Sequence, residues 1–457
     1  MADHPNSSGA DAASAVERVW LDELAGILAA SPGVVGARVL GSSARGEAAG
    51  LWWEGRWQRL SDLELLVICR SRLGPAAQRR IRERVDAASA TWGQGSPLFH
   101  LDLVFRERRR LRSLPPFVFT YEAREAGRTL LGPELGPTIR RVTLANLDRR
   151  NTREILVKRL WHLVEALPAD LGAMPAPSPF LAAGLRVGIE RQALDLPTAL
   201  LPDAGRLIAG FQARLRSWER EPPAAAATIE AWLGRAFVPY LSEVLAARGG
   251  LALGRGPWTE AYAPALAVLA GGLDHLCSLQ IAEQKVRDPA GGRVRPRAHV
   301  PDLAAALAAL AEDLPQVSSR LFNERSVTPG EAWATWQQAV RIANSRGARE
   351  GLRWLRRPRK GLLAAGLLQL HAAGLAIVEG RLEAAPPALL AARRSLAAVH
   401  ADAPSPEPPP AEALVTAHGA GGRADDPSAH FETWRAVRRE AGRAFWRVAR
   451  LGSPTAW

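Results

Sequence analysis

The most informative segment of this chain of 457 residues contains Ser61-Asp62-Leu63-Glu64-Leu65. Apolar residues continue from it to Cys69, as in a strand of a buried sheet. Because alternate residues of a strand point to opposite faces, Asp62 and Glu64 share one face while Leu63 and Leu65 face a core. Two neighbouring carboxylates repel each other unless a cation lies between them. Oxygen ligands suit Mg²⁺, so the pattern favours a magnesium site.

A glycine-serine turn precedes this strand, and a third carboxylate follows it. Gly41-Ser42-Ser43 comes directly after an expected strand over residues 34–40, and Ser42 or Ser43 can cap a short helix that contains Arg45. Glycine lets the backbone approach a phosphate closely, and the start of a helix offers free N–H groups to an anion. Arg45 either contacts that phosphate or lies in solvent. Asp102 lies on a later apolar strand, expected over residues 98–105.

Three tryptophans lie between the turn and the acidic strand. Trp52, Trp53 and Trp57 surround Glu54-Gly55, a pattern typical of a β-hairpin with its turn at these two residues. The indole rings either stack on a base or an acceptor ring, or pack against another part of the protein.

The pattern changes at about residue 143. Long segments rich in Ala, Leu and Arg follow, and prolines mark where helices start and stop. The predicted fold class is therefore α+β, with an N-terminal mixed sheet and flanking helices followed by a large all-helical region. We expect a disordered N-terminus over 1–11, a sheet domain over 12–142, a helical domain over 143–401, a linker rich in Pro and Gly over 402–427 and a basic C-terminal helix over 428–457.

The formal net charge of +13 favours phosphate-rich partners. Nearly all of the positive charge is arginine, so the base composition of the genome is an equally good explanation. Two clusters carry much of it. The segment from Arg346 to Lys360 binds an RNA backbone, forms a solvated helix end or docks on the acidic cleft. The run Arg106 to Arg112 either draws a triphosphate toward the carboxylates or forms a solvated turn.

Two features bear on location. The only cysteines, Cys69 and Cys277, suggest neither a disulfide framework nor a zinc site, which fits a reducing cytoplasm. The longest apolar stretch, residues 361–378, is interrupted by Gln369 and His371, so we expect a buried helix and no membrane span. A cytoplasmic protein is predicted.

Taken together, these motifs resemble the nucleotidyltransferase superfamily, whose core is similar to that of DNA polymerase beta. Gly41-Ser42 matches the first element of its pattern, Asp62 and Glu64 the second, and Asp102 the third. Within the superfamily, the chain is similar to the aminoglycoside-type branch that modifies small molecules. Residues 125–132 resemble a Gly-x-x-Leu-Tyr-Gly stretch of such enzymes, with Leu131 in place of the tyrosine. The resemblance covers roughly residues 12–135, and the 20 positions from Ser42 to Asp62 exceed the family's spacing by about the length of the hairpin.

The resemblance implies transfer of a nucleoside monophosphate, most often AMP from ATP, to a hydroxyl of a small molecule. Asp62 and Glu64 would bridge two Mg²⁺ (or Mn²⁺) ions, and Asp102 would hold the catalytic one and help to deprotonate the acceptor. Gly41, Ser42, Ser43 and Arg45 would bind the nucleotide. Two alternatives stay open: the same chemistry on RNA or protein, and a non-catalytic interaction module that keeps the fold.

Overall fold

The computed structural model describes most of the chain, in several separate parts. These are residues 6–90, 92, 101–168, 179–248, 256–287, 302–322, 359–400 and 427–452. Contacts between residues divide the chain into two compact units, each discontinuous in sequence. The first unit contains Met1–Thr152, Pro177–Pro223 and Val238–Ala261, and the second contains Arg153–Ala176, Ala224–Phe237 and Tyr262–Trp457.

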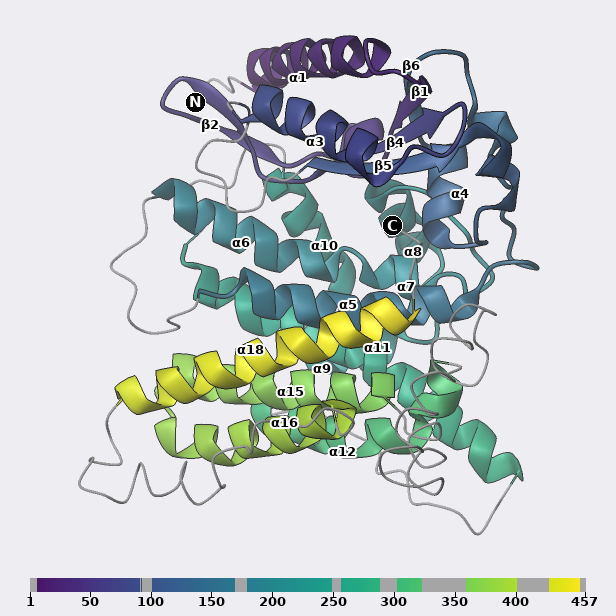
Figure 1. Ribbon diagram of the computed structural model, residues 1–457. Helices are drawn as coiled ribbons and strands as arrows, with labels where there is room; N and C mark the ends of the chain where they lie inside the picture. Colours follow the sequence, from purple (N-terminus) through teal and green to yellow (C-terminus); the bar gives the residue numbers. More distant parts are fainter. Residues whose placement is uncertain are drawn as a thin grey trace. The chain divides into compact units, whose positions relative to one another are not determined.

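The first unit is built on a four-stranded mixed sheet (Figure 1). Its strands are β1 (Val34–Val39), β4 (Leu63–Cys69), β5 (Leu101–Glu107) and β6 (Arg128–Leu131), in the order β5-β4-β1-β6. β4 pairs in parallel with β5, whereas β1 pairs antiparallel with both β4 and β6. The expectation of an α+β chain with a small mixed sheet and many helices is confirmed.

Both faces of this sheet are covered. On one face, α1 (Asn6–Ala29) and α3 (Pro75–Ser89) bury a core that includes Leu24, Val85 and the odd-numbered residues of β4. On the other face lie Leu66 and Ile68, in a second core formed with the segments that follow β5. Those segments are η1 (Arg108–Ser113), α4 (Val118–Glu125) and η2 (Gly136–Thr138). The alternation expected for β4 is thus confirmed, and Asp62 and Glu64 lie on the side of the second core.

The tryptophan-rich segment forms the expected hairpin. β2 (Gly50–Trp53) pairs antiparallel with β3 (Arg56–Arg59), and Glu54 and Gly55 at the turn both have positive φ, of 49° and 72°. Two consecutive positive φ angles match the twist of a two-residue hairpin turn, which explains why glycine stands at the second position.

Helices complete the first unit. They are α6 (Pro179–Ala193), α7 (Leu196–Leu200), α8 (Phe211–Arg220) and most of α10 (Phe237–Ala246). The side chains of Phe180, Ala183 and Val187 on α6 bury Leu51 and Leu60 of the hairpin region. This packing places α6 beside the start of β4.

The second unit consists of helices in its described part. They are α5 (Arg149–Ala166, from Arg153 on), α9 (Ala226–Leu233), α11 (Trp258–Arg287, from Tyr262 on), α12 (Leu303–Leu321), α15 (Arg359–Val378), η4 (Leu382–Ala384), α16 (Ala385–His400) and α18 (Pro427–Gly452). α15 packs against α12, α16 and α18. A Cβ atom at Gly374 of α15 would lie 3.1 Å from the ring of Trp434 on α18, so glycine permits this close approach. The expected C-terminal helix is present as α18, whereas residues 402–426 lie outside the described parts.

Two helices are long and apolar enough to cross a membrane by length and composition, within Trp258–Glu283 and Arg359–Val378. Of their most apolar windows, 67% and 83% of the residues are buried inside the protein. A helix that is apolar on all sides is expected to be buried, in a protein core or in a membrane. The prediction that residues 361–378 form a buried helix is confirmed.

The start of the chain departs from expectation. α1 already begins at Asn6, so the helix extends into the segment expected to be disordered. β6 was not expected as a strand, because its four residues show no clear alternation.

Candidate active site

The three predicted carboxylates lie at one end of β4 and β5. The parallel pairing sets Glu64 directly opposite Asp102, on strands that are about 4.8 Å apart. Asp62 precedes Glu64 by two residues and so lies on the same side of the chain. The Asp62 side chain is 10% exposed, Glu64 is half-buried and Asp102 is exposed. Residues 38 positions apart in sequence are thus neighbours across the sheet.

The glycine turn lies against the same carboxylates. The Leu40 N–H donates to the Glu64 carbonyl over 2.9 Å, which brings the end of β1 beside the start of β4. Gly41 follows with a φ of 60°, and a Cβ atom there would collide with the Glu64 carboxylate. Only glycine accommodates both the left-handed conformation and this contact. The predicted juxtaposition of turn and acid is present, although α2 (Gly41–Ala44) is a single turn.

The two serines of the turn differ in environment. Ser43 is buried, and its hydroxyl accepts a hydrogen bond from Arg59. The Ser42 side chain is partly exposed and makes no hydrogen bond within the described residues. Of the two predicted nucleotide-binding hydroxyls, only that of Ser42 is available to a ligand in this arrangement.

Arg59 ties the turn to the acidic strand. It is 1% exposed and, besides Ser43, it donates to the carbonyl oxygens of Ser61 and Asp62 over 2.8 and 3.0 Å. Its guanidinium also forms an ion pair with Glu17 of α1 at 2.8 Å. A planar guanidinium with several donors suits such a junction, because each buried acceptor receives a hydrogen bond.

Electrostatics at Glu64 reflect a crowded acidic site. The pKa of Glu64 is raised to about 7, mainly by burial; within this net value, the positive charge of Arg191 opposes the rise and the charges of Asp62, Glu122 and Asp102 contribute to it. Carboxylates within reach of one another favour protonation of one member of the group. This is an acidic cluster that gains from a nearby positive charge.

Arg191 on α6 supplies part of that charge. Its Nη1 atom donates to Asp62 Oδ2 over 2.9 Å, and the Arg191 side chain is 22% exposed. Burial opposes the charge on Arg191, yet Asp62 and Asp195 together raise its pKa above the ordinary arginine value. The ion pair therefore stabilises both charges in a largely buried place.

A second guanidinium lies nearby. Arg248 is buried, donates over 3.2 and 3.3 Å to the carbonyl oxygen of Glu47, and stacks over the ring of Phe211 at 5.6 Å. The pKa of Arg248 is lowered to about 9, mainly by burial and in part by the positive charge of Arg191. Among the described residues, the Arg248 Nη1 atom is buried without a hydrogen-bond partner. An anion beside Arg191 and Arg248 would stabilise both.

Arg45 was expected either to contact a phosphate or to lie in solvent, and the structure places it in a third environment. It forms ion pairs with Glu47 at 2.7 Å and with Glu122 at 3.4 Å, and it covers the ring of Phe211 at 5.3 Å. The Glu47 carboxylate also accepts the N–H groups of Phe211 and Gln212 at the start of α8. Arg45 is thus neither solvated nor paired with the three carboxylates, and it links the glycine turn to α8.

The donor types of the site suit a hard divalent cation, but the described side chains do not converge on one point. Within the described residues, no group of three or more His, Cys, Asp or Glu side chains is arranged to hold a metal ion. Part of the reason is visible, since Asp62 faces Arg191. Three carboxylates from two adjacent strands nevertheless offer the oxygen ligands that Mg²⁺ prefers.

The arginine run after β5 begins at a distance from the three carboxylates. Arg106 to Arg112 begins at the far end of β5 from Asp102, about 13 Å along the strand at 3.3 Å per residue. The run is therefore not next to the carboxylates. The other predicted cluster, Arg346 to Lys360, lies outside the described residues except for its last two members.

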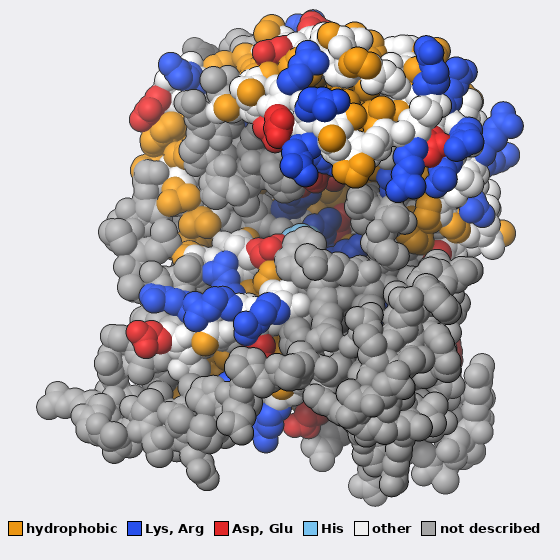
Figure 2. Space-filling model, viewed as in Figure 1, with side chains coloured by type: hydrophobic (Ala, Val, Ile, Leu, Met, Phe, Trp, Pro, Cys, Tyr) orange, Lys and Arg blue, Asp and Glu red, His pale blue; other side chains and the backbone are white. Residues whose placement is uncertain are grey.

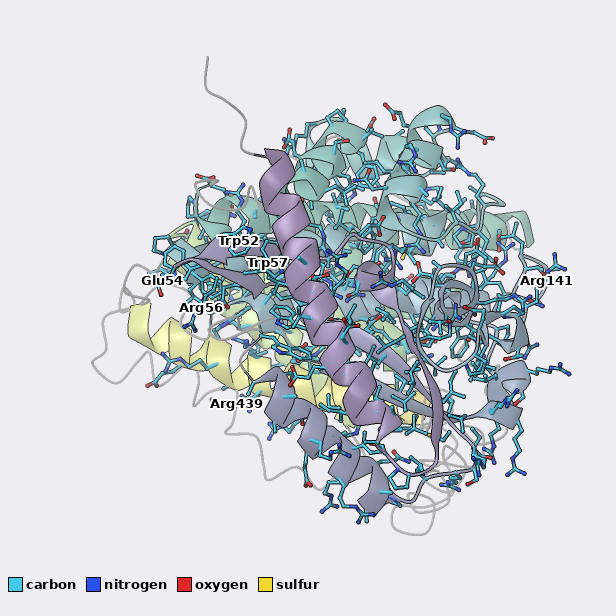
Figure 3. All side chains as sticks on the ribbon, turned by 90° about the horizontal axis from the view of Figure 1, so that it is seen from above. Trp52, Glu54, Arg56, Trp57, Arg141 and Arg439 are labelled. Atoms are coloured by element: carbon cyan, nitrogen blue, oxygen red, sulfur yellow. The ribbon has the colours of Figure 1, made fainter. Side chains whose placement is uncertain are left out.

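The hairpin meets α6 through one of its tryptophans. Trp53 packs against Phe180 with ring centroids 5.9 Å apart. Trp57 covers Gly50 of the opposite strand, while Trp52 is 39% exposed. Figure 3 shows Trp52 and Trp57 on this hairpin, with Glu54 and Arg56 near its tip. Packing accounts for Trp53, and Trp52 is the most exposed of the three.

Sequence reasoning missed Arg59, Arg191 and Arg248. Each is one of many arginines, on an element that is remote in sequence or that has no motif around it. Arg191 stands between Glu190 and Gln192 in the sequence, so its immediate surroundings resemble those of an ordinary exposed helical arginine.

Comparison of the chain with protein-family models, curated proteins and solved structures finds no match.

Proposed function

We propose that this protein is a metal-dependent nucleotidyltransferase that transfers a nucleoside monophosphate, AMP in the first instance, to a hydroxyl of a small molecule. In this reaction the hydroxyl oxygen forms a bond to the α-phosphorus of a nucleoside triphosphate. The bond from that phosphorus to the bridging oxygen breaks, and pyrophosphate leaves. The hydroxyl proton passes to a base, for which the exposed Asp102 carboxylate is our candidate.

One observation carries the proposal. Gly41, Glu64 and Asp102 belong to separate parts of the sequence but meet at one end of the sheet, with Glu64 against the glycine and opposite Asp102. Asp62 shares the side of Glu64. This arrangement supports the proposal, because transfer at a phosphate needs acidic ligands beside a backbone turn that a phosphate can approach.

Each side chain has a role in the proposal. Asp62, Glu64 and Asp102 would hold Mg²⁺, whose charge would neutralise the phosphate oxygens and the leaving pyrophosphate. Arg191 and Arg248 would face the same phosphate groups, since guanidinium pairs well with phosphate oxygens. Ser42 would donate its hydroxyl to a phosphate, and Arg59 would hold the turn and the acidic strand together.

The test is incubation with α-labelled ATP, Mg²⁺ and a panel of hydroxyl-bearing small molecules, followed by mass analysis of labelled products and assay of pyrophosphate. We expect transfer by the wild type and by the control variant Asp86→Asn. Asp86 is an exposed residue of α3, so this variant makes the same Asp-to-Asn change away from the acidic site. Asp62→Asn and Asp102→Asn should lose transfer while keeping their circular dichroism. Transfer at the wild-type rate in either variant contradicts the assignment.

A second candidate is a binding module without catalysis. The observation that favours it is the Asp62–Arg191 ion pair, which can substitute permanently for a metal ion. Such a module would show no heat of Mg²⁺-ATP binding in calorimetry, and the ion pair would persist in the presence of Mg²⁺.

A further inference from the structure

Arginines gather at the end of the sheet opposite the carboxylates. The segments 70–80 and 108–113 contain eight arginines and no Asp or Glu. We name them the arginine edge; its members are Arg70, Arg72, Arg79, Arg80, Arg108, Arg109, Arg110 and Arg112. All eight are exposed. In the whole chain, 59 basic residues stand against 46 acidic ones, so average composition does not account for this concentration.

The fold brings these segments to one surface. β4 and β5 run parallel, with Cys69 opposite Glu107, so the residues that follow each strand emerge side by side. Glu107 is buried beneath them and pairs with Arg109 at 2.6 Å and with Arg110 at 3.4 Å. The hydrogen bond from Arg109 lowers the pKa of Glu107, and the charge of Arg72 contributes from the other segment.

α3 brings its arginines to the same place. Arg82 donates to the Leu103 carbonyl over 2.7 Å and lies 5.2 Å above the ring of Phe105, which fixes α3 along β5. Because α3 connects the end of β4 to the start of β5, it runs against the strands. Its first turns, which carry Arg79 and Arg80, therefore lie toward the ends of both strands. In Figure 2, many Lys and Arg side chains lie on the upper part of the molecule, where Figure 1 draws the sheet and α3.

Most of these guanidinium groups are not used by the fold. Within the described residues, six members of the arginine edge make no side-chain hydrogen bond or ion pair: Arg70, Arg72, Arg79, Arg80, Arg108 and Arg112. Like charges that have no hydrogen bond or ion pair and lie on neighbouring elements repel each other, so the surface gains from a polyanion that spans them.

We propose that the arginine edge binds the phosphate backbone of a double-helical nucleic acid. Guanidinium groups suit phosphate oxygens, because their planar donors match them in pairs. Among the described residues, the exposed large hydrophobic side chains are Val19, Trp52 and Leu279, and none of them belongs to the arginine edge. Stacking on unpaired bases needs aromatic rings, and lying in a membrane interface needs an apolar face. A duplex backbone needs neither, and its charge density is high.

The test is fluorescence anisotropy of labelled 20-bp RNA and DNA duplexes with the full chain, at salt concentrations from 50 to 200 mM. We expect binding of at least one duplex, with an affinity that falls steeply as salt rises. The variant Arg79→Gln/Arg108→Gln should bind more weakly and lower the slope of log affinity against log salt by about 2, one per lost phosphate contact. The control Arg216→Gln/Arg220→Gln removes the same charge from exposed positions of α8 and should bind like the wild type.

Two results would overturn the proposal. They are failure to bind either duplex at 50 mM salt, and equal losses of affinity in the two double variants. The proposal does not depend on nucleotidyl transfer, and Asp62→Asn should bind the duplex like the wild type.

Discussion

Replacing Arg191 by methionine tests the electrostatic design of the acidic site. At 2.9 Å and an effective dielectric constant of about 20, the attraction between Arg191 and Asp62 is about 6 kcal/mol before desolvation. Removing one partner of a buried pair costs about 3–5 kcal/mol, because the other charge stays buried. Asp62 and Arg191 are 10% and 22% exposed, so we take the lower limit of about 3 kcal/mol for Arg191→Met.

This loss is measurable as a change in melting temperature. A unit of this size loses about 2–4 °C per kcal/mol, so Arg191→Met should melt about 6–12 °C lower in the presence of a chelator. If the carboxylates hold a metal ion, Mg²⁺ should replace the missing positive charge. At ten times its dissociation constant a ligand adds about 1.4 kcal/mol, and the variant should recover more stability with Mg²⁺ than the wild type gains.

Differential scanning calorimetry with and without Mg²⁺ provides the measurement. Arg186→Met is the matched control: it lies on the same helix and pairs with Glu190 at 3.0 Å and with Glu260 at 3.3 Å, so it loses ion pairs away from the acidic site. Its loss should not respond to Mg²⁺. The reasoning is refuted if Arg191→Met melts like the wild type, or if Mg²⁺ affects the Arg191 and Arg186 variants equally.

Three further predictions concern buried groups. The folded-state pKa of Glu64 is raised to about 7 from 4.5, so rising pH destabilises the metal-free protein between these values. In urea unfolding, the stability of Glu64→Gln relative to the wild type should therefore rise by up to about 3 kcal/mol from pH 4.5 to 8. A stability difference that is constant with pH contradicts this prediction. His371 is fully buried, and burial lowers its pKa from 6.5 to about 4. The wild type should therefore lose up to about 3 kcal/mol of stability as the pH falls through this window, whereas the stability of His371→Leu should not change there. Parallel stability profiles of the two proteins against pH would count against a buried neutral imidazole. Arg59→Met should lower the free energy of unfolding by at least about 3 kcal/mol, because four acceptors lose one buried donor group. Arg59→Lys should not restore this stability, since an ammonium group lacks the planar fork of donors. Full rescue by lysine would show that charge alone matters.

Local patterns in the sequence predict much of the sheet. The alternation of Asp62, Leu63, Glu64 and Leu65 depends only on strand geometry, and the structure buries both leucines as expected. The turn at Glu54-Gly55 can likewise be predicted locally, because glycine readily adopts the positive φ that this turn needs.

Local patterns do not predict which residues far apart in the sequence lie in contact. That Glu64 lies opposite Asp102 depends on strand register, which the two short segments do not specify by themselves. The Arg191–Asp62 pair joins residues 129 positions apart, and the sequence around Arg191 does not indicate its partner. The inward orientation of Ser43 depends on Arg59, a neighbour only after the hairpin has folded.

Calorimetric titration of the full chain with ATP measures whether the three carboxylates form a binding site. We expect binding in the presence of Mg²⁺, loss of binding in Asp62→Asn and in Asp102→Asn, and retention in Asp86→Asn. No binding to the wild type, or the same affinity in all four proteins, would contradict the claim that these carboxylates form a site for metal and polyphosphate.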